Sequence, residues 1–337
     1  MCNLRCTYCF YADVSDIREV KCHPFMSNEI MEKMIDQIFI DLDEGDHITF
    51  GFQGGEPTLI GPRYYKKFIS YVEKQPKKVH AHYTIQTNGT RITEEWCEIF
   101  KEHNFLVGLS IDGWEATHNL YRLDTGGNGT YRRISQTKQL FDEYEIEYNV
   151  LSVLTKQIAS EPKRYYDYLK NEGIDYIQII PCLDSLEDEA GDEESEFALT
   201  PDLFAHFYNE IYRLWKRDLE TGDYVSVKFI DDVFNLVHHR QVTSCGMLGQ
   251  RVNPYIIEAN GDVYPCDFYC LDEFKIGNIL EDTLFDMRDT KTVRDFICFD
   301  REISPFCESC PFLKMCDAGS NRMKNAMYLN KDQSHCG

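Results

Sequence analysis

HITFGFQGGEP, residues 47–57, is the stretch that decides the fold class. The apolar alternation of HITFGF predicts a strand, and the strand runs directly into a polar turn that holds two glycines. The same arrangement recurs along the chain: YTIQT is followed by Asn88-Gly89, and FLVGLSI is followed by Asp112-Gly113. Each pair alone is typical of an ordinary turn. Three such turns, each at the end of a predicted strand, indicate that the strand ends meet at one opening.

Strand and helix patterns alternate from about residue 27 to residue 220. We expect strands at 47–52, 80–87, 105–111, 147–154 and 176–181, and helices that begin near Ser27, Thr93 and Thr200. This alternation predicts a parallel sheet or barrel, in which the carboxyl ends of the strands build the active site.

Length and charge bound the class of protein. The 337 residues suffice for two domains, and we place the boundary where the alternation stops, giving 1–225 and a cysteine-rich 226–337. No apolar run reaches the roughly 18 residues that span a membrane. The net charge of -22 argues against a nucleic-acid partner, because such proteins neutralise phosphates with Lys and Arg.

Fourteen cysteines in a chain without a secretory signal favour metal or redox chemistry over disulfides. Cys2, Cys6 and Cys9 lie within the first nine residues, with no fourth cysteine nearby. Zinc is the simpler alternative, but structural zinc sites close with a fourth ligand. A [4Fe-4S] cluster held by three thiolates keeps one iron open to a small molecule.

Two motifs carry a resemblance. CNLRCTYC and GGEP, at a strand end, are similar to the signatures of radical S-adenosylmethionine (SAM) enzymes. Together with CTYCFY, FQGGEPT, QTNGT, HNLYR and GDVYPCDFY, the terminal cysteines extend the match, and the chain resembles the anaerobic sulfatase-maturating enzymes. The resemblance implies a partial (β/α)6 barrel of the radical SAM type followed by a SPASM domain. Only Met1 precedes Cys2, so we expect the barrel's first strand to be missing and one edge to be unpaired.

The resemblance also implies an activity and its residues. The family oxidises a Cys or Ser side chain of a sulfatase peptide to Cα-formylglycine. It implies that Cys2, Cys6 and Cys9 hold the catalytic cluster, to which SAM binds. The implied SAM site is Tyr8, Gly55, Ser110, Arg122 and Leu183, and the implied substrate contacts are Tyr11 and Gln53.

Asp267, in GDVYPCDFY, matches the general base of the family. A carboxylate beside Cys266 is suited to accept the proton that leaves the target thiol or hydroxyl. From the residues alone, a surface aspartate after a turn is the simpler interpretation. His118 lies in a matched stretch too, and we expect it to be structural.

The rear cysteines are expected to hold auxiliary clusters. The resemblance places one [4Fe-4S] cluster on Cys307, Cys310, Cys316 and Cys336, with zinc as the alternative. A further cluster is doubtful, because only Cys245 and Cys266 match, whereas Arg251 and Ser320 replace the expected cysteines. Cys270 is an extra thiol nearby. The remaining cysteines, Cys22, Cys97, Cys182 and Cys298, are expected to be packing residues.

The implied partners are an unfolded or nascent sulfatase peptide and a low-potential electron donor of the flavodoxin or ferredoxin type. Thiolate clusters and the missing export signal indicate a reducing cytoplasm. Two alternatives stay open: another radical SAM/SPASM peptide maturase, forming thioethers or epimers, and a non-catalytic iron-sulfur scaffold.

Overall fold

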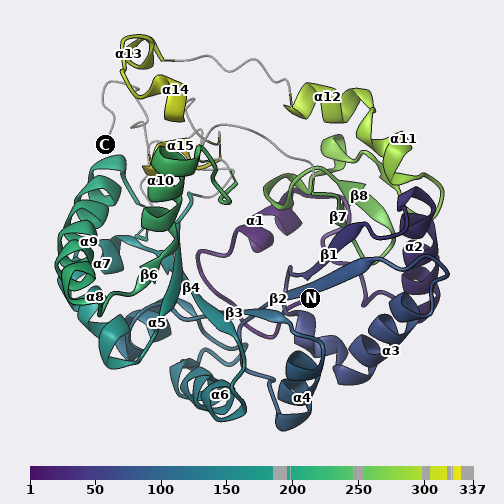
Figure 1. Ribbon diagram of the computed structural model, residues 1–337, viewed down its shortest axis with the longest axis horizontal. Helices are drawn as coiled ribbons and strands as arrows, with labels where there is room; N and C mark the ends of the chain where they lie inside the picture. The colour runs from purple at the N-terminus through teal and green to yellow at the C-terminus, as the bar shows by residue number, and fades with distance from the viewer. Residues whose placement is uncertain are drawn as a thin grey trace.

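The computed structural model describes residues 1–184, 196–197, 199–245, 247, 254–297, 304–316, 320 and 322–327. Six parallel strands form one curved sheet in the order β1 to β6 (Figure 1). Within this described part, β1 and β6 are the two edges and do not pair, so the barrel is open. The predicted partial barrel is therefore confirmed. Its strands are β1 (His47–Phe52), β2 (His80–Thr87), β3 (Leu106–Ser110), β4 (Tyr148–Leu154), β5 (Tyr176–Pro181) and β6 (Ser226–Val227).

The parallel register brings the polar strand ends to one rim. His47 lies opposite His80, and Phe52, the last residue of β1, lies opposite Ile85 of β2. In β3, Val107 to Ser110 are buried, as expected of a strand covered on both faces. The predicted strands thus deliver their glycine-rich turns to the same edge.

Helices cover the outer face of the sheet (Figure 1). The Ser27 side chain caps α2 (Asn28–Asp41) by accepting a hydrogen bond from the Ile30 amide, and Thr200 caps α9 (Pro201–Thr221) in the same way. Such a cap typically contributes about 1 kcal/mol. The other helices that follow the strands are α3 (Pro62–Glu73), α4 (Glu94–Glu102), α5 (Glu115–Tyr121), α6 (Tyr131–Tyr144), α7 (Lys156–Ala159), α8 (Pro162–Asn171) and α10 (Lys228–His239).

One apolar core joins the sheet, the helices and the C-terminal region. Tyr65 and Trp96, both buried, meet edge to face at 4.8 Å between ring centroids. The same cluster of buried side chains includes Val263, Ile279 and Met287. The C-terminal region is thus packed onto the barrel through a continuous core.

The C-terminal region is built on a small antiparallel sheet of β7 (Ile256–Ile257), β8 (Asp262–Tyr264) and β9 (Gly277–Asn278). It lies beside α2 and β1, and α11 contacts α2 (Figure 1). Its short helices are η3 (Asp267–Tyr269), η4 (Asp272–Phe274), α11 (Leu284–Arg288), α12 (Lys291–Ile297), α13 (Pro305–Glu308), α14 (Leu313–Cys316) and α15 (Lys324–Met327). The boundary at 225/226 stays a prediction; β6 and α10 follow it and contact β5.

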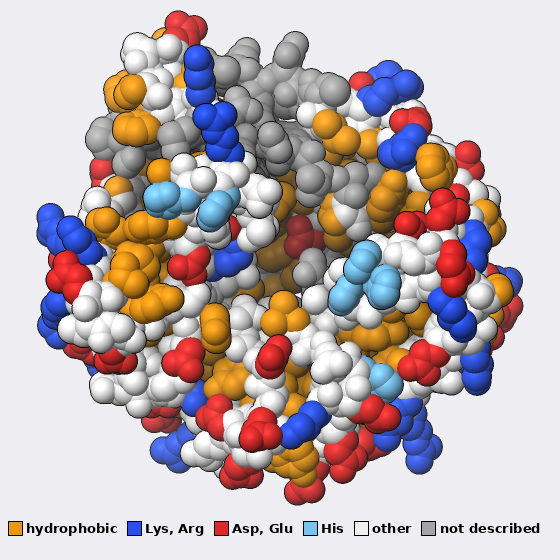
Figure 2. Space-filling view, in the orientation of Figure 1, with side chains coloured by type: hydrophobic (Ala, Val, Ile, Leu, Met, Phe, Trp, Pro, Cys, Tyr) orange, Lys and Arg blue, Asp and Glu red, His pale blue; other side chains and the backbone are white. Residues whose placement is uncertain are grey.

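The first helix, α1 (Phe10–Ile17), lies inside the ring of strands and not in the outer layer (Figure 1). The space-filling view shows this face hollowed near its centre, with apolar side chains along the walls of the hollow (Figure 2). Across the described residues, none of the helices has the length and apolarity needed to traverse a bilayer.

Candidate active site

The loop that carries Cys2, Cys6 and Cys9 lies over the ends of the strands. On one side, the Asn3 side chain donates to Thr90 Oγ1 (2.8 Å) and accepts from Asn88 Nδ2 (3.0 Å), beyond the end of β2. Asn88 Nδ2 also lies 3.9 Å from Cys2 Sγ. The loop is thereby tied to the rim of the barrel.

On its other side the loop is tied to the end of α5. The Arg5 amide donates to the Leu123 carbonyl (2.7 Å), and the Thr7 amide donates to the Tyr121 carbonyl (3.2 Å). Leu4 is buried and forms an isolated bridge with Asp124. These backbone bonds hold the cysteine loop between two parts of the barrel.

The three thiols of the loop suit an iron-sulfur cluster. All three are free and half-buried. Burial raises the pKa of Cys2, and burial raises the pKa of Cys6 to about 12, so neither ionises readily without a cation. Iron supplies that positive charge, since metal ligation requires the thiolate. A three-thiol donor set on one short loop therefore fits a cluster with one open iron.

The turn after β1 has a backbone that favours glycine. Gly54 and Gly55 have φ values of +90° and +61°, in the left-handed region. A Cβ on Gly55 would lie 2.3 Å from the Met1 carbonyl oxygen, so a larger residue is excluded. The close approach to Met1 explains why glycine stands here, and the place of Gly55 in a SAM site stays a prediction.

Glu56, in the same turn, is a buried carboxylate whose contacts were not predicted from the sequence. Its carboxylate is 2% exposed and accepts hydrogen bonds from the Asn88 amide (2.7 Å) and from Thr87 Oγ1 (2.8 Å). It therefore joins the end of β1 to the end of β2. In the sequence, the sign of these contacts was a charged residue directly after two glycines in a turn.

Tyr8 and Arg122, two expected SAM-site residues, converge on Asp112. Arg122 Nε donates to Asp112 Oδ2 (2.7 Å), the Tyr8 hydroxyl donates to the same oxygen, and the Val153 amide donates to Oδ1 (2.9 Å). Burial would raise the pKa of Asp112, but the charge of Arg122 and its hydrogen bonds outweigh this and lower it. Arg122 is thus already paired, and its role toward a SAM carboxylate stays a prediction.

His118 supports this buried network as a neutral side chain. Its Nδ1 accepts from the Asp112 amide (3.2 Å), and its Nε2 lies 3.1 Å from Thr130 Oγ1. Burial lowers the pKa of His118 to about 3. These contacts agree with the structural role expected of it.

The other two expected SAM-site residues also lie at strand ends. Ser110 is the last residue of β3, and its hydroxyl accepts from Gln86 Nε2 (3.0 Å). Leu183 follows β5 and is buried. The five expected SAM-site residues thus come from the cysteine loop, the ends of β1, β3 and β5, and the end of α5.

Asp267 meets two expected substrate contacts from distant parts of the chain. Gln53, after β1, donates through Nε2 to Asp267 Oδ2 (3.1 Å). Burial, and then the charge of Asp267, raise the pKa of Tyr11. Burial also raises the pKa of Asp267, which makes it a better proton acceptor than an exposed carboxylate. The barrel rim and the C-terminal region therefore share one polar site.

The rear cysteines are described in part. The Cys310 amide donates to the Cys307 carbonyl (3.0 Å), and Cys316 ends α14 shortly afterwards. Burial, with the charge of Cys310, raises the pKa of Cys307, so these two thiols are neighbours. Cys336 lies outside the described residues.

The doubtful further cluster would need four cysteines, and the described residues provide two neighbouring thiols for it, those of Cys245 and Cys266. Cys245 and Cys266 lie close enough that the charge of Cys245 raises the pKa of Cys266, after the larger effect of burial. Cys270 is buried in an apolar cluster, and its thiol donates to the Cys266 carbonyl (3.5 Å). Ser320 is half-buried, and Arg251 lies outside the described residues. The donor set described here does not match four cysteine ligands.

Two of the scattered cysteines are packing residues, as expected. Cys97 and Cys182 are buried. The expectation is wrong for Cys22, which is exposed and follows the helix that leaves the cysteine loop. Cys298 lies outside the described residues.

An open parallel barrel, with three free cysteines above its strand ends and a cysteine-rich appendage, defines the class of protein. Sequence profiles agree: that of the radical SAM superfamily matches residues 1–169, and that of the SPASM iron-sulfur cluster-binding domain matches residues 245–311. The molecule is a radical SAM enzyme with an auxiliary iron-sulfur domain.

Relatives narrow the class. The chain is 37% identical to the cysteine-type anaerobic sulfatase-maturating enzyme of Clostridium novyi over 98% of its own length and 87% of that protein's. It is 29% identical to the serine-type enzyme of Bacteroides thetaiotaomicron, over 94% of this chain and 79% of that one. The solved structure of native anSMEcpe with bound AdoMet and Kp18Cys peptide superposes with a TM-score of 0.89 at 34% identity, over 97% and 88% of the two chains. The chain belongs to the anaerobic sulfatase-maturating enzyme family.

Proposed function

We propose that this enzyme oxidises the Cβ of a Cys or Ser side chain in a sulfatase peptide to the aldehyde of Cα-formylglycine. The observation that carries the proposal is the contact between Gln53, at the barrel rim, and Asp267, in the C-terminal region (3.1 Å). This hydrogen bond links Gln53, which is expected to contact the substrate, to Asp267, which is expected to act as the general base. The names of the relatives and the peptide in the solved structure support the same substrate class.

The cofactor site is proposed on the cysteine loop and the strand ends. Cys2, Cys6 and Cys9 would hold the [4Fe-4S] cluster, and SAM would lie among Tyr8, Gly55, Ser110, Arg122 and Leu183. Cluster and SAM together supply the chemistry that removes a hydrogen atom from the target Cβ.

Asp267 is proposed to complete the oxidation by accepting a proton. The Asp267 carboxylate would accept the thiol or hydroxyl proton of the target side chain, and an iron-sulfur centre held by Cys307, Cys310, Cys316 and Cys336 would supply the further one-electron oxidation. A serine then carries a carbonyl directly. A cysteine carries a C=S group, which water converts to the aldehyde with release of hydrogen sulfide. Gln53 orients the carboxylate through its hydrogen bond.

The test is a reconstituted assay. The protein, loaded with iron and sulfide without oxygen, is incubated with SAM, a one-electron reductant and a peptide that contains Cys-x-Pro-x-Arg, beside its Ser twin. An aldehyde at the target residue of either peptide, seen by mass spectrometry, supports the proposal. 5'-Deoxyadenosine with a thioether or an epimerised residue instead would favour another SPASM maturase, and no SAM cleavage would leave only a scaffold.

Iron content tests the cluster inventory. Because Arg251 and Ser320 replace two expected ligands, we expect about eight irons per chain, from two cubes of four. Iron and sulfide analysis of the anaerobically reconstituted protein measures this. A Cys307→Ala variant serves as the comparison and should fall to about four irons. About twelve irons in the unmodified chain would show that the site at Cys245 and Cys266 holds a cluster after all.

A further inference from the structure

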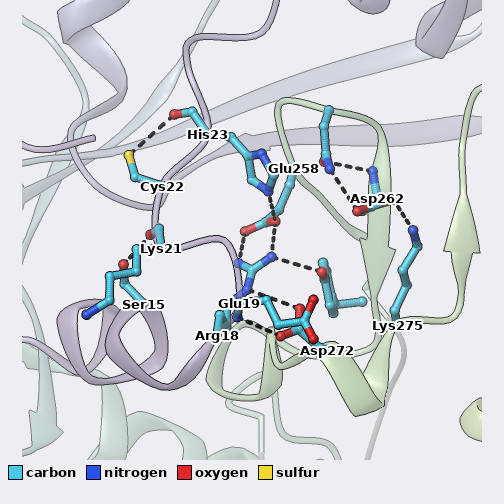
Figure 3. A network of polar contacts seen from close by, with 12 residues as sticks. Ser15, Arg18, Glu19, Lys21, Cys22, His23, Glu258, Asp262, Asp272 and Lys275 are labelled. Carbon is cyan, nitrogen blue, oxygen red and sulfur yellow. Dashed lines mark hydrogen bonds and ion pairs between the residues drawn. The ribbon is translucent and has the colours of Figure 1, made fainter.

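Arg18 joins the helix that leaves the cysteine loop to the small C-terminal sheet. Its Nη1 and Nη2 donate to Glu258 Oε1 (2.5 Å) and Oε2 (2.6 Å), a two-pronged ion pair across 240 residues of sequence (Figure 3). Nη2 also donates to the Tyr264 hydroxyl (2.9 Å). Only 7% of the Arg18 side chain is exposed. Such a paired geometry is specific to arginine.

The surroundings reinforce this ion pair. Asp272 accepts a hydrogen bond from the Glu19 amide (3.0 Å), and its Oδ1 lies 3.9 Å from Arg18 Nε (Figure 3). His23 Nε2 lies 3.4 Å from Glu258 Oε2. The hydrogen bonds with Glu258 raise the pKa of Arg18, so its charge is permanent. We call Arg18, Glu258, Tyr264 and Asp272 the clamp.

An apolar layer lies beside the clamp and, like the clamp, joins α1 to the C-terminal region. Val14 of α1 packs in one buried cluster with Tyr264, Cys270 and Leu271. At the start of α1, the Phe10 ring lies 4.7 Å from the Phe268 ring of η3. Helix α1 therefore packs against the C-terminal region along its length, although its residues precede the whole barrel in sequence.

The two ends of α1 belong to different sites, the cysteine loop and the clamp. Cys9, an expected cluster ligand, is the N-cap residue of the helix, and Arg18 is its C-cap residue. Eight helical residues span about 12 Å at 1.5 Å per residue, so α1 is a short rigid link between the cysteine loop and the clamp. Helix η3, which α1 contacts, begins at Asp267.

We propose that Arg18 is a positioning residue: through the clamp and α1, it holds the cysteine loop at a fixed place relative to Asp267. The inference rests on the proposed function. A hydrogen atom taken by SAM chemistry yields product only when the proton acceptor stands at the same Cβ, and a misplacement of 1 Å can cost about 100-fold in rate. The clamp thus couples SAM cleavage to peptide oxidation.

The test is the ratio of aldehyde to 5'-deoxyadenosine in the loaded enzyme. Arg18→Gln is expected to lower aldehyde formation by about 10- to 100-fold, while SAM cleavage falls less than about threefold. Glu258→Gln should do the same. Arg18→Lys should give an intermediate ratio, since an ammonium cannot bind both carboxylate oxygens in parallel. Lys21→Gln is the matched control, because Lys21 pairs with Asp16 in the same segment but is exposed, and it should keep the ratio of the unmodified enzyme.

Two readouts keep the inference separate from the proposed function. Hydrogen exchange of the amides in residues 10–17 should rise in Arg18→Gln and return toward the original rate in the exchanged pair Arg18→Glu/Glu258→Arg. If the unmodified enzyme makes no aldehyde, the proposed function fails, and the exchange rates still decide whether the clamp exists. An unchanged product ratio, or unchanged exchange in α1, would overturn the inference. If Arg18→Gln does not fold, Arg18→Lys supplies both measurements.

Discussion

Replacement of Asp267 by asparagine should lower the rate of aldehyde formation by about 100-fold or more, because a positioned proton acceptor contributes a factor of about 100 to 10,000. Asparagine has almost the same shape but cannot take up the proton, and its single amide oxygen can keep either the hydrogen bond from Gln53 or the one from the Phe268 amide. Asp267 belongs to η3, whereas the expected SAM-site residues lie at the barrel rim. SAM binding is therefore expected to stay the same. Single-turnover assays of aldehyde formation, with SAM affinity measured separately, give the two quantities.

Glu273→Gln is the control for Asp267→Asn. Glu273 is an exposed carboxylate in η4, six residues further along, and its loss should leave both quantities unchanged. Aldehyde formation at the original rate in Asp267→Asn would remove Asp267 from the mechanism. Weaker SAM binding in that variant would instead show that Asp267 contributes to the cofactor site.

The sequence predicted the barrel well, because its signals are local. The strands β1, β2 and β5 have the bounds expected from HITFGF, HAHYTIQT and YIQIIP, each a strand-like pattern that ends at a turn or a break. Ser27 and Thr200 cap helices as expected. In these stretches side-chain periodicity and turn residues point to the same structure.

The sequence could not predict the contacts that build the site. Arg18 and Glu258 are 240 residues apart, and Gln53 and Asp267 are 214 apart, so neither pairing has a local pattern. Helix α1 was not predicted either. It has eight residues, and it packs against side chains such as Phe268 that lie far along the chain. Short helices depend on tertiary packing more than on propensity.

Asp112 is a further residue whose contacts could not be predicted from the local sequence. In the sequence, Asp112-Gly113 is a turn after a strand, and nothing local marks the aspartate as buried. In the structure it is 1% exposed and accepts hydrogen bonds from Tyr8, Arg122 and the Val153 amide. The sequence does place Arg122 ten residues after Asp112, beyond a short helix. That spacing identifies Arg122 as the ion-pair partner of Asp112 only once the fold is known.

Asp112→Asn should destabilise the protein by about 3–5 kcal/mol at pH 7, the typical result of leaving one charge of a buried pair without its partner. The unpaired charge is that of Arg122, whose side chain is 8% exposed. Anaerobic urea unfolding of the two proteins measures the difference. Asp167→Asn is the control, because Asp167 pairs with Lys163 at the surface, and its loss should cost less than about 1 kcal/mol.

The pH dependence of that difference identifies its cause. The pKa of Asp112 in the folded protein is lower than its ordinary value of 3.8, so the carboxylate stabilises the fold at pH values above 3.8. This stabilisation is lost as the pH falls through the folded-state pKa, where Asp112 takes up a proton and resembles asparagine. The gap between Asp112→Asn and the unmodified protein should therefore be constant near neutral pH and narrow in acid. A gap that stayed the same in acid would show that shape, not charge, makes Asp112 necessary, and the anchor for Tyr8 and Arg122 would then be steric.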